Sequence, residues 1–399
     1  MLAAFEQRSE MKIDRVETFV LKVPLGAERF YSSQAEFPER NSLLVRLTTT
    51  DGVVGWGEGG QYGPAEPVQA AVDAVLGPRL LELDTTDPGV VWEHLYASTR
   101  DYGQKGTYIE AISAIDIALW DLTGKYLGVS VSTLLGGRFR ERVRAYGTGG
   151  YYRHTGLDPA RDLPALQDEV SRYAESGFSM LKMKVGLLPV REDALRVAAV
   201  REALGDDFSL LADANHAYTS SAAIAMGRVL EEARFEFFEE PVPPEDRAGY
   251  ARVRAAIDVP VAGGEAEYTR YGFRDFITGG CVDIVQPDIC VAGGISEVQR
   301  IATLASTYNL RTVPHVWGSG VALSAGLHVC ATLPLTPYGY SAVPLQNEPV
   351  IEFDRTPNPL RDDLLVNPAI LEDGHVAVPS GPGLGIEVNM EVVERYRTA

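Results

Sequence analysis

Five polar residues recur at nearly even intervals along the second half of this 399-residue chain, each at the end of a short apolar run. They are Asp213, Glu239, Glu265, Asp288 and His315, and successive members lie 23 to 27 residues apart. Such an interval holds about one strand, one helix and two loops. The spacing predicts a (β/α) barrel, because the carboxyl ends of its parallel strands meet at one rim and bring distant residues together.

The segments that flank this repeat show other patterns. Residues 11–60 alternate β-branched and polar side chains around turn signals such as Asp51-Gly52, which predicts a three-stranded antiparallel meander. Residues 66–136 have apolar residues at helical spacing. The chain is rich in Pro and Gly from about residue 358, and its run at 383–389 predicts one further strand.

Eight strand-like apolar runs alternate with helical segments between residues 143 and 354, and a closed eight-stranded barrel is the simplest fold for them. The sequence therefore predicts an α/β protein built around this barrel. Its predicted parts are a loose leader at 1–10, an N-terminal α+β capping domain at 11–140, the (β/α) barrel at 141–357, and a C-terminal segment at 358–399 that packs back on the capping domain.

The chain is acidic, with a formal net charge of −19, which disfavours nucleic acid and anionic membranes as partners. No apolar run approaches the roughly 20 residues needed to span a bilayer. The first ten residues lack the features of a secretory signal. Three cysteines, Cys281, Cys290 and Cys330, lie scattered without metal-binding spacing, which predicts packing roles for reduced thiols in a cytoplasmic protein.

Three carboxylates follow successive apolar runs of the predicted barrel: Asp213, Glu239 and Glu265. Any one of them alone would fit the cap of the next helix. Three in successive units instead predict a metal site at the rim. Oxygen ligands without Cys or His suit Mg²⁺ or Mn²⁺ better than Zn²⁺.

Two of the chain's six lysines, Lys182 and Lys184, lie two positions apart in one strand-like run. Strand alternation points both into the barrel and Met183 outward toward the helices. Burial and a neighbouring ammonium predict a lowered pKa for one of them, which would make it a general base. The alternative is an edge strand guarded by lysines, which a closed barrel does not contain.

Asp288 and His315 end neighbouring predicted strands. A carboxylate that accepts a hydrogen bond from one imidazole nitrogen fixes the tautomer and raises the basicity of the other nitrogen. The pair therefore predicts a second acid/base group. His154 and His328 are interpreted as structural, and His216, three residues after Asp213, is left open between a structural and a site role.

Together these motifs resemble the enolase superfamily, mandelate racemase group, over nearly the whole chain. The matching motifs include GWGE in the first domain and the LLGG junction, and in the barrel Lys182-Met183-Lys184, DAN at 213–215, FFEEP at 237–241, GGE at 263–265, QPD at 286–288 and PHVWG at 314–318. The resemblance implies a modified TIM barrel with a capping domain. It implies that Asp213, Glu239 and Glu265 hold Mg²⁺.

The resemblance also implies roles for the proton carriers. Lys184 is the implied base on one face of the substrate, tuned by Lys182, and the Asp288–His315 pair is the implied acid/base on the other. A further Glu near the eighth strand is expected to bind the substrate carboxylate, with Glu352 and Glu348 as the two candidates. Other predicted substrate contacts are Asn215, His216 and Trp317 in the barrel and Tyr31 in a capping loop.

Within the group the motifs look most like galactarolactone cycloisomerase and acid-sugar dehydratases. The implied reaction is Mg²⁺-dependent removal of the proton α to a carboxylate of a sugar acid or its lactone, followed by β-elimination. One alternative is a racemase or epimerase of an α-substituted carboxylic acid, and another is a non-catalytic binding protein that retains the metal. The sequence leaves the sugar acid and its stereochemistry open, and a homo-oligomer is the expected assembly.

Overall fold

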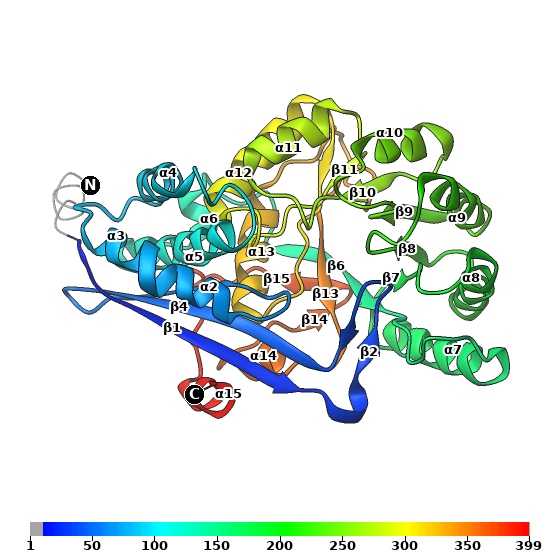
Figure 1. Cartoon of the computed structure of the whole chain (residues 1–399), viewed down its shortest axis with the longest axis horizontal. Coiled ribbons are helices and arrows are strands. Elements are labelled where there is room, and N and C mark those ends of the chain that lie inside the picture. Colours follow the sequence, from blue (N-terminus) through cyan, green and yellow to red (C-terminus); the bar gives the residue numbers. More distant parts are fainter. Residues whose placement is uncertain (1–10, 399) are drawn as a thin grey trace.

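The computed structural model describes residues 11–398, so the predicted leader lies outside the described residues. Elements from the first part of the chain lie beside a ring of strands surrounded by helices (Figure 1). Within residues 11–398, no helix is both long enough and apolar enough to cross a bilayer. All three cysteines are buried free thiols, which confirms their packing roles.

The predicted meander is confirmed as an antiparallel sheet of β1 (Ile13–Pro24), β4 (Glu39–Thr49) and β5 (Val54–Gly59). Helix α5 (Thr107–Leu127) lies directly on β5, where a side chain at Gly57 would collide with the carbonyl of Ala114. The glycines of the GWGE motif therefore permit close helix–sheet contact. The remaining elements are η1 (Gly26–Glu28), β2 (Phe30–Tyr31), β3 (Glu36–Phe37), α2 (Glu66–Ala71), the π-helical η2 (Val72–Leu76), α3 (Gly77–Leu81), α4 (Pro88–Thr99) and α6 (Val131–Leu134).

All eight predicted barrel strands form. They are β6 (Arg142–Gly149), β7 (Met180–Lys184), β8 (Ser209–Asp213), β9 (Phe235–Glu239), β10 (Val261–Gly263), β11 (Ile284–Val285), β12 (Arg311–Thr312) and β13 (Val350–Asp354). Neighbours pair in parallel from β6 to β12, and β13 pairs with β6. Among the described strands no ladder joins β12 to β13, so the hydrogen-bonded ring has one open seam instead of the full closure that was expected.

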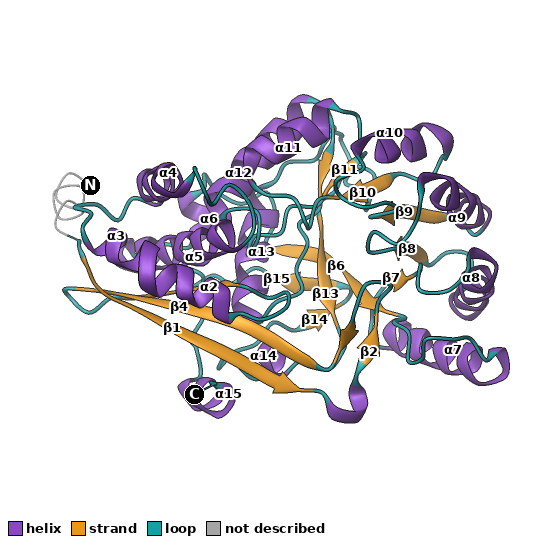
Figure 2. Cartoon of the chain, in the orientation of Figure 1, coloured by secondary structure: helices purple, strands orange, loops and turns teal. Residues whose placement is uncertain are grey.

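Helices alternate with these strands and surround the barrel (Figure 2). Residues of the barrel interior, including Met180, Leu211 and Phe237, form a buried apolar cluster. Along β7 and β8 this cluster precedes the polar residues at the strand ends, so it forms a floor below them. The helices are α7 (Pro159–Glu175), α8 (Val190–Leu204), α9 (Ser220–Glu232), α10 (Arg247–Ala256), α11 (Thr269–Thr278), α12 (Gly294–Thr307) and α13 (Gly320–Thr332).

The capping region is joined to the barrel by a buried carboxylate. Glu58, at the end of β5, accepts hydrogen bonds from the backbone nitrogens of Ser319 (2.8 Å) and Ala322 (2.9 Å) at the start of α13. The otherwise unpaired N–H groups of that helix are therefore satisfied by a residue from the other part of the chain. This contact holds the loop after β5 against the barrel rim.

The C-terminal segment contains α14 (Pro359–Asp362), β14 (Leu371–Glu372), β15 (His375–Ala377) and α15 (Met390–Tyr396). The strand predicted at 383–389 is wrong, because only isolated bridges form there and Gly383 and Gly385 have a φ of +66°. Strand β15 instead pairs with β6 of the barrel. Helix α15 packs on β1, and the N–H of Thr398 donates to the carbonyl of Val20 (2.9 Å).

His328 of α13 lies where three parts of the chain meet. Its Nε2 donates to the carbonyl of Leu384 in the C-terminal segment (3.1 Å), and its Nδ1 accepts from the N–H of Ser132 in α6 (3.3 Å). Burial lowers the pKa of His328 to about 4. The neutral imidazole satisfies both neighbours, which confirms the structural interpretation of this residue.

The buried His328 should make the protein less stable in mild acid. The unfolded chain binds a proton at this residue below about pH 6.5, whereas the folded chain does so only below about pH 4, so falling pH favours unfolding across that window. The contribution amounts to up to about 3 kcal/mol at the acid end of the window. Between pH 7 and pH 5 the free energy of unfolding, measured with urea, should therefore fall. We expect this decrease to be smaller in His328→Gln than in the wild-type protein.

The exposed His94 on α4 supplies the matched control, and His94→Gln should keep the wild-type pH dependence. An unchanged stability difference between pH 7 and pH 5 in His328→Gln would contradict the assignment.

Candidate active site

Strand β7 brings both lysines into the barrel. Lys182 is fully buried and Lys184 is 5% exposed, while Met183 packs into the core between the sheet and the helices. Lys184 lies opposite Asp213 in the β7–β8 register, and its ammonium donates to that carboxylate. The predicted alternation along β7 is therefore confirmed.

The three predicted carboxylates converge at one rim of the barrel. Asp213 and Glu239 are the last residues of β8 and β9, and Glu265 follows β10 by two residues. One oxygen from each lies within 4.8 Å of the others, and all three side chains are buried. Parallel strands that end at the same level account for this convergence.

The charges of this cluster are only partly compensated by the lysines. Burial raises the pKa of Glu239 to about 8 despite Lys182, whose ammonium lies 2.8 Å away. Burial and the nearby Glu240 raise the pKa of Glu265 to about 7. Burial also opposes ionisation of Asp213, but Lys184 and Lys182 lower the pKa of that residue to about 2. The two lysines therefore leave part of the negative charge of the cluster unbalanced, and a further positive charge there would be stabilised.

The lowered pKa predicted for one of the two lysines is wrong for the protein without a bound cation. Burial disfavours the ammonium of Lys184, but Asp213 and Tyr151 outweigh it and raise its pKa above the usual value. For Lys182, burial is likewise outweighed by Glu239 and Glu352, so its pKa is also raised. The carboxylates that contact each lysine therefore outweigh the repulsion between the two ammonium groups.

Asp288 and His315 form the predicted pair at the end of neighbouring strands. His315 Nδ1 donates to Asp288 Oδ2 (2.6 Å), and His315 Nε2 lies 3.1 Å from Glu265 Oε2. Burial disfavours the imidazolium, but Glu265, Glu352 and Asp288 raise the pKa of His315 to about 10. Two residues that follow β5 contact this pair. Gln61 donates to Asp288, and the Tyr62 hydroxyl lies 3.2 Å from His315 Nε2.

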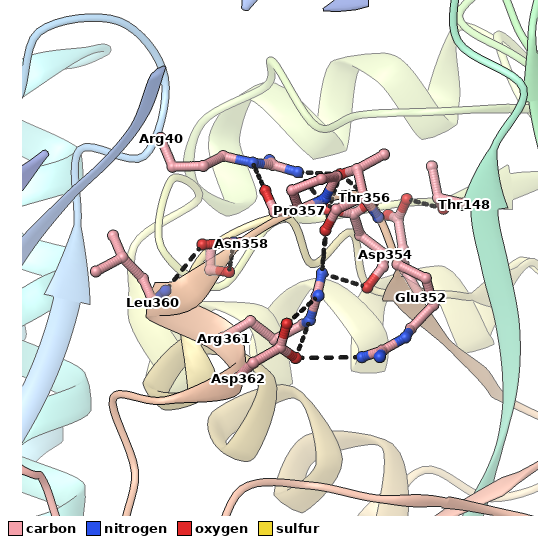
Figure 3. A network of polar contacts seen from close by, with 12 residues as sticks. Arg40, Thr148, Glu352, Asp354, Thr356, Pro357, Asn358, Leu360, Arg361 and Asp362 are labelled. Atoms are coloured by element: carbon pink, nitrogen blue, oxygen red, sulfur yellow. Dashed lines mark hydrogen bonds and ion pairs between the residues drawn. The ribbon is translucent and has the colours of Figure 1, made fainter. Parts of the chain in front are cut away.

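The structure separates the two glutamates proposed for the eighth strand. Glu352 lies in the site, 3.0 Å from Lys182 Nζ and 3.6 Å from His315 Nε2, and it accepts from the Thr148 hydroxyl (Figure 3). Glu348 precedes β13 and pairs with Arg144 near the start of β6 (3.4 Å). Because strand starts lie at the end of a barrel opposite the strand ends, Glu348 is excluded as a substrate contact, which corrects that prediction.

A cavity of about 350 Å³ opens above the cluster, between the barrel and the segments that follow β1 and β5. Three of the predicted substrate contacts, Asn215, His216 and Trp317, line it together with Glu265. Tyr31 does not line it, which corrects that prediction. Its backbone pairs with Tyr152 and its side chain faces a separate surface depression beside Arg153.

His216, which lines the same cavity, pairs with a carboxylate. Its Nε2 lies 3.0 Å from Glu240, and burial of the ring is outweighed by Glu240, which raises the pKa of His216 to about 9. His216 and Glu240 have positive φ values of 67° and 44°. Of the two roles left open for His216, structural or in the site, its position favours the second, because the residue lines the cavity.

Two groups in the described residues have the composition and spacing to hold a cation: Asp213, Glu239 and Glu265, and the group of His216, Glu240 and Glu265. The first consists only of carboxylates, which are the ligands that Mg²⁺ prefers. Glu265 Oε2 is buried and makes no hydrogen bond, and its charged neighbour His315 Nε2 lies 3.1 Å away, so its remaining lone pairs are available to a cation. Hydrogen bonds from neighbouring residues orient the other two carboxylates: Gln286 donates to Glu239, and the N–H of Asn215 donates to Asp213. The all-carboxylate group therefore fits Mg²⁺ better.

Several site residues were not assigned from the sequence. Glu240 and Gln286 lie inside the FFEEP and QPD motifs, so their motif membership was an available signal. Gln61, Tyr62 and Asn41 come from the capping region, and no spacing rule connects them to the barrel residues that they face. Only the folded arrangement identifies Asn41 and the individual contacts of Gln61 and Tyr62.

Comparison with known proteins agrees with this geometry. Residues 165–392 match the family described as "Enolase C-terminal domain-like", and residues 15–136 match "Mandelate racemase / muconate lactonizing enzyme, N-terminal domain". The chain is 44% identical over 390 residues to D-galactarolactone cycloisomerase of Agrobacterium fabrum, covering 97% of this chain and 99% of that protein.

Solved structures of two enzymes are similar to this chain over nearly its whole length. The 3,6-anhydro-D-galactonate cycloisomerase from Zobellia galactanivorans is 41% identical, with a TM-score of 0.85 over 97% of this chain and 100% of that chain. An L-talarate/galactarate dehydratase variant liganded with Mg and L-glucarate is 28% identical, with a TM-score of 0.85 over 98% of this chain and 93% of that chain. The predicted (β/α) barrel with its capping domain is thereby confirmed.

Adjacent glutamates provide a test of the two candidate cation groups. MgCl₂ should raise the thermal unfolding midpoint of the wild-type protein, because a ligand at 100 times its Kd stabilises the folded state by about 2.7 kcal/mol. We expect Glu239→Gln to abolish this increase, since it replaces a negatively charged carboxylate ligand with a neutral amide of nearly the same shape. Glu240→Gln, which alters only the second group, should retain the increase. Loss of the increase in Glu240→Gln alone would assign the cation to the other group.

Proposed function

Because this chain belongs to the mandelate racemase and muconate lactonizing enzyme family, with a barrel domain of the enolase type, we propose a specific reaction for it. The chain is an enzyme of the enolase superfamily. In our proposal it removes the proton α to the carboxylate of a sugar acid or its lactone and then eliminates a β-oxygen leaving group. The names of the cycloisomerases and the dehydratase that it resembles support this reaction class.

One geometric observation supports the proposal most directly. Lys184 and His315 contact different members of a single carboxylate cluster, Lys184 at Asp213 and His315 at Glu265. They also come from separate sectors of the barrel, β7 and the loop after β12. A substrate carboxylate bound at the cluster therefore has one proton carrier near each side of its α carbon.

The acid group of the substrate would bind at the carboxylate cluster through a cation. A divalent cation held by Asp213, Glu239 and Glu265 would supply positive charge to the substrate carboxylate and so acidify its α hydrogen. Mg²⁺ is our proposed ion, and Mn²⁺ suits the same oxygen ligands. Lys182, held between Glu239 and Glu352, adds a fixed positive charge at the same place.

Lys184 is the proposed base. When Asp213 also serves a cation, Lys184 loses part of the attraction that raises its pKa, and its proton affinity falls toward the range that general base catalysis needs. The Tyr151 ring, whose centroid lies 5.2 Å from the ammonium, keeps this side of the site free of bulk water.

His315 is the proposed acid on the other side. Asp288 holds its Nδ1–H, so the reactive Nε2 points toward Glu265 and the cavity. As the Cβ–O bond breaks, the electron pair leaves with the oxygen, and His315 donates a proton where that oxygen departs as an alkoxide or hydroxide. Tautomerisation of the resulting enol gives a 2-keto acid.

Glu352 has a different proposed role from the one expected. It already accepts from Thr148 and contacts Lys182, so it positions the Lys182 ammonium instead of binding the substrate carboxylate directly. Its pKa fits that role, because burial is outweighed by Lys182 and His315, which lower it.

Removal of either proton carrier should abolish turnover. We expect Lys184→Ala and His315→Asn each to lower kcat by at least about 100-fold, since general acid–base catalysis contributes roughly that much or more. The assay follows 2-keto acid formation with semicarbazide across sugar acids and their 1,4-lactones in MgCl₂. Lys105→Ala, at an exposed lysine, is the matched control and should retain activity.

The same assay in D₂O separates the proposal from racemisation, which two bases on opposite faces would also permit. Accumulation of deuterated epimer without 2-keto acid would replace β-elimination with racemase activity. Full activity of Lys184→Ala would contradict the base assignment.

A further inference from the structure

The outer part of the substrate cavity is lined by neutral, aromatic and acidic side chains. Tyr62 and Trp317 form one wall, with ring planes 11° apart and centroids separated by 5.9 Å, and Phe37 meets Trp317 edge-on at 4.9 Å. Glu39 is an acidic group in the lining. Among the lining residues within 11–398 there is neither Lys nor Arg, and the basic residue His216 is paired with Glu240.

Buried polar atoms in this wall have no protein partner. They are Asn41 Oδ1, Gln61 Oε1 and Trp317 Nε1, and all three residues line the cavity. Buried donors and acceptors of this kind are costly unless a ligand satisfies them. An aromatic wall with isolated neutral donors and acceptors matches the surface of a sugar ring, which presents C–H groups and hydroxyls together.

Two cations near this region, Arg40 and Lys22, are already engaged with carboxylates. Arg40 stacks behind Trp317, with its guanidinium carbon 4.1 Å from the ring centroid, and points away toward Asp354 (2.6 Å) and Thr356 (Figure 3). Lys22, the cross-strand partner of Asn41, pairs with Glu66 at 2.6 Å. A second substrate carboxylate in the outer cavity would therefore be desolvated beside Glu39 without a free cation.

We infer that the cavity selects a sugar acid whose far end is an uncharged ring, as in a lactone or an anhydro sugar, over an open-chain dicarboxylate, with Glu39 as the residue that sets this preference. The inference rests on the proposed function, because the acid group of the substrate must occupy the carboxylate cluster. Glu39 acts through like-charge repulsion, which is an element of specificity as effective as a new attraction.

For a lactone this arrangement also affects the product. Elimination breaks the Cβ–O bond, and the electron pair stays on the former ring oxygen as a second carboxylate, so the product carries one more negative charge than the substrate at its far end. That charge forms beside Glu39, where it favours product release.

The test compares an aldarate 1,4-lactone, the open-chain aldarate of the same configuration and the matching aldonate, whose far end is a neutral hydroxymethyl group. With MgCl₂ present, we expect kcat/KM for the aldarate to be at least about 100-fold below that for the lactone, with the aldonate between them. Glu39→Gln should shrink the lactone/aldarate ratio about tenfold, and Glu39→Lys should shrink it further. The control Glu372→Lys, at an exposed position on β14, should leave the ratio unchanged.

Two results would overturn the inference: an aldarate that equals or exceeds the lactone, or a ratio that Glu39→Lys does not change. If Lys22→Met lowers aldarate turnover selectively, Lys22 receives the second carboxylate and the inference is also wrong. If no acid is turned over, the proposed function fails separately. Calorimetric binding of the same three ligands to the Mg²⁺-loaded protein then decides the selectivity alone.

Discussion

Uncompensated negative charge at the barrel rim is the constraint on which the rest of the site depends. Asp213, Glu239 and Glu265 are buried within 4.8 Å of one another, and two lysines balance them only in part. Burial of like charges is expensive, so the arrangement requires fixed partners and further positive charge. The contacts of Lys182, Lys184 and Gln286 with these carboxylates follow from that requirement.

The barrel alone does not complete this site. Gln61 and Tyr62 follow β5 of the capping sheet and contact Asp288 and His315, and Glu58 in the same segment caps helix α13. Some of the residues that contact the Asp288–His315 pair therefore come from the capping region, whereas the pair itself comes from the barrel. The cap also supplies part of the cavity wall, so the environment of the substrate's far end changes with capping residues while the barrel chemistry stays constant.

The sequence predicted some features more accurately than others for identifiable reasons. Strand alternation placed Lys182 and Lys184 correctly, because a period of two leaves no choice once one face is buried. The pKa of Lys184 was predicted in the wrong direction because its Asp213 contact crosses from β7 to β8. Glu348 and Tyr31 were misplaced because each lies near a correct residue in sequence and faces elsewhere in space.

By itself the sequence determined the barrel, the antiparallel cap, the carboxylate cluster and the Asp288–His315 pair, since each follows from local periodicity and the common rim of parallel strands. Tertiary structure alone decided which capping side chains face the barrel, as with Gln61 and Glu39, and which charges compensate one another. Local patterns fix where a side chain points within its own strand or helix. Contacts between elements distant in sequence depend on packing, and the pKa values depend on those contacts.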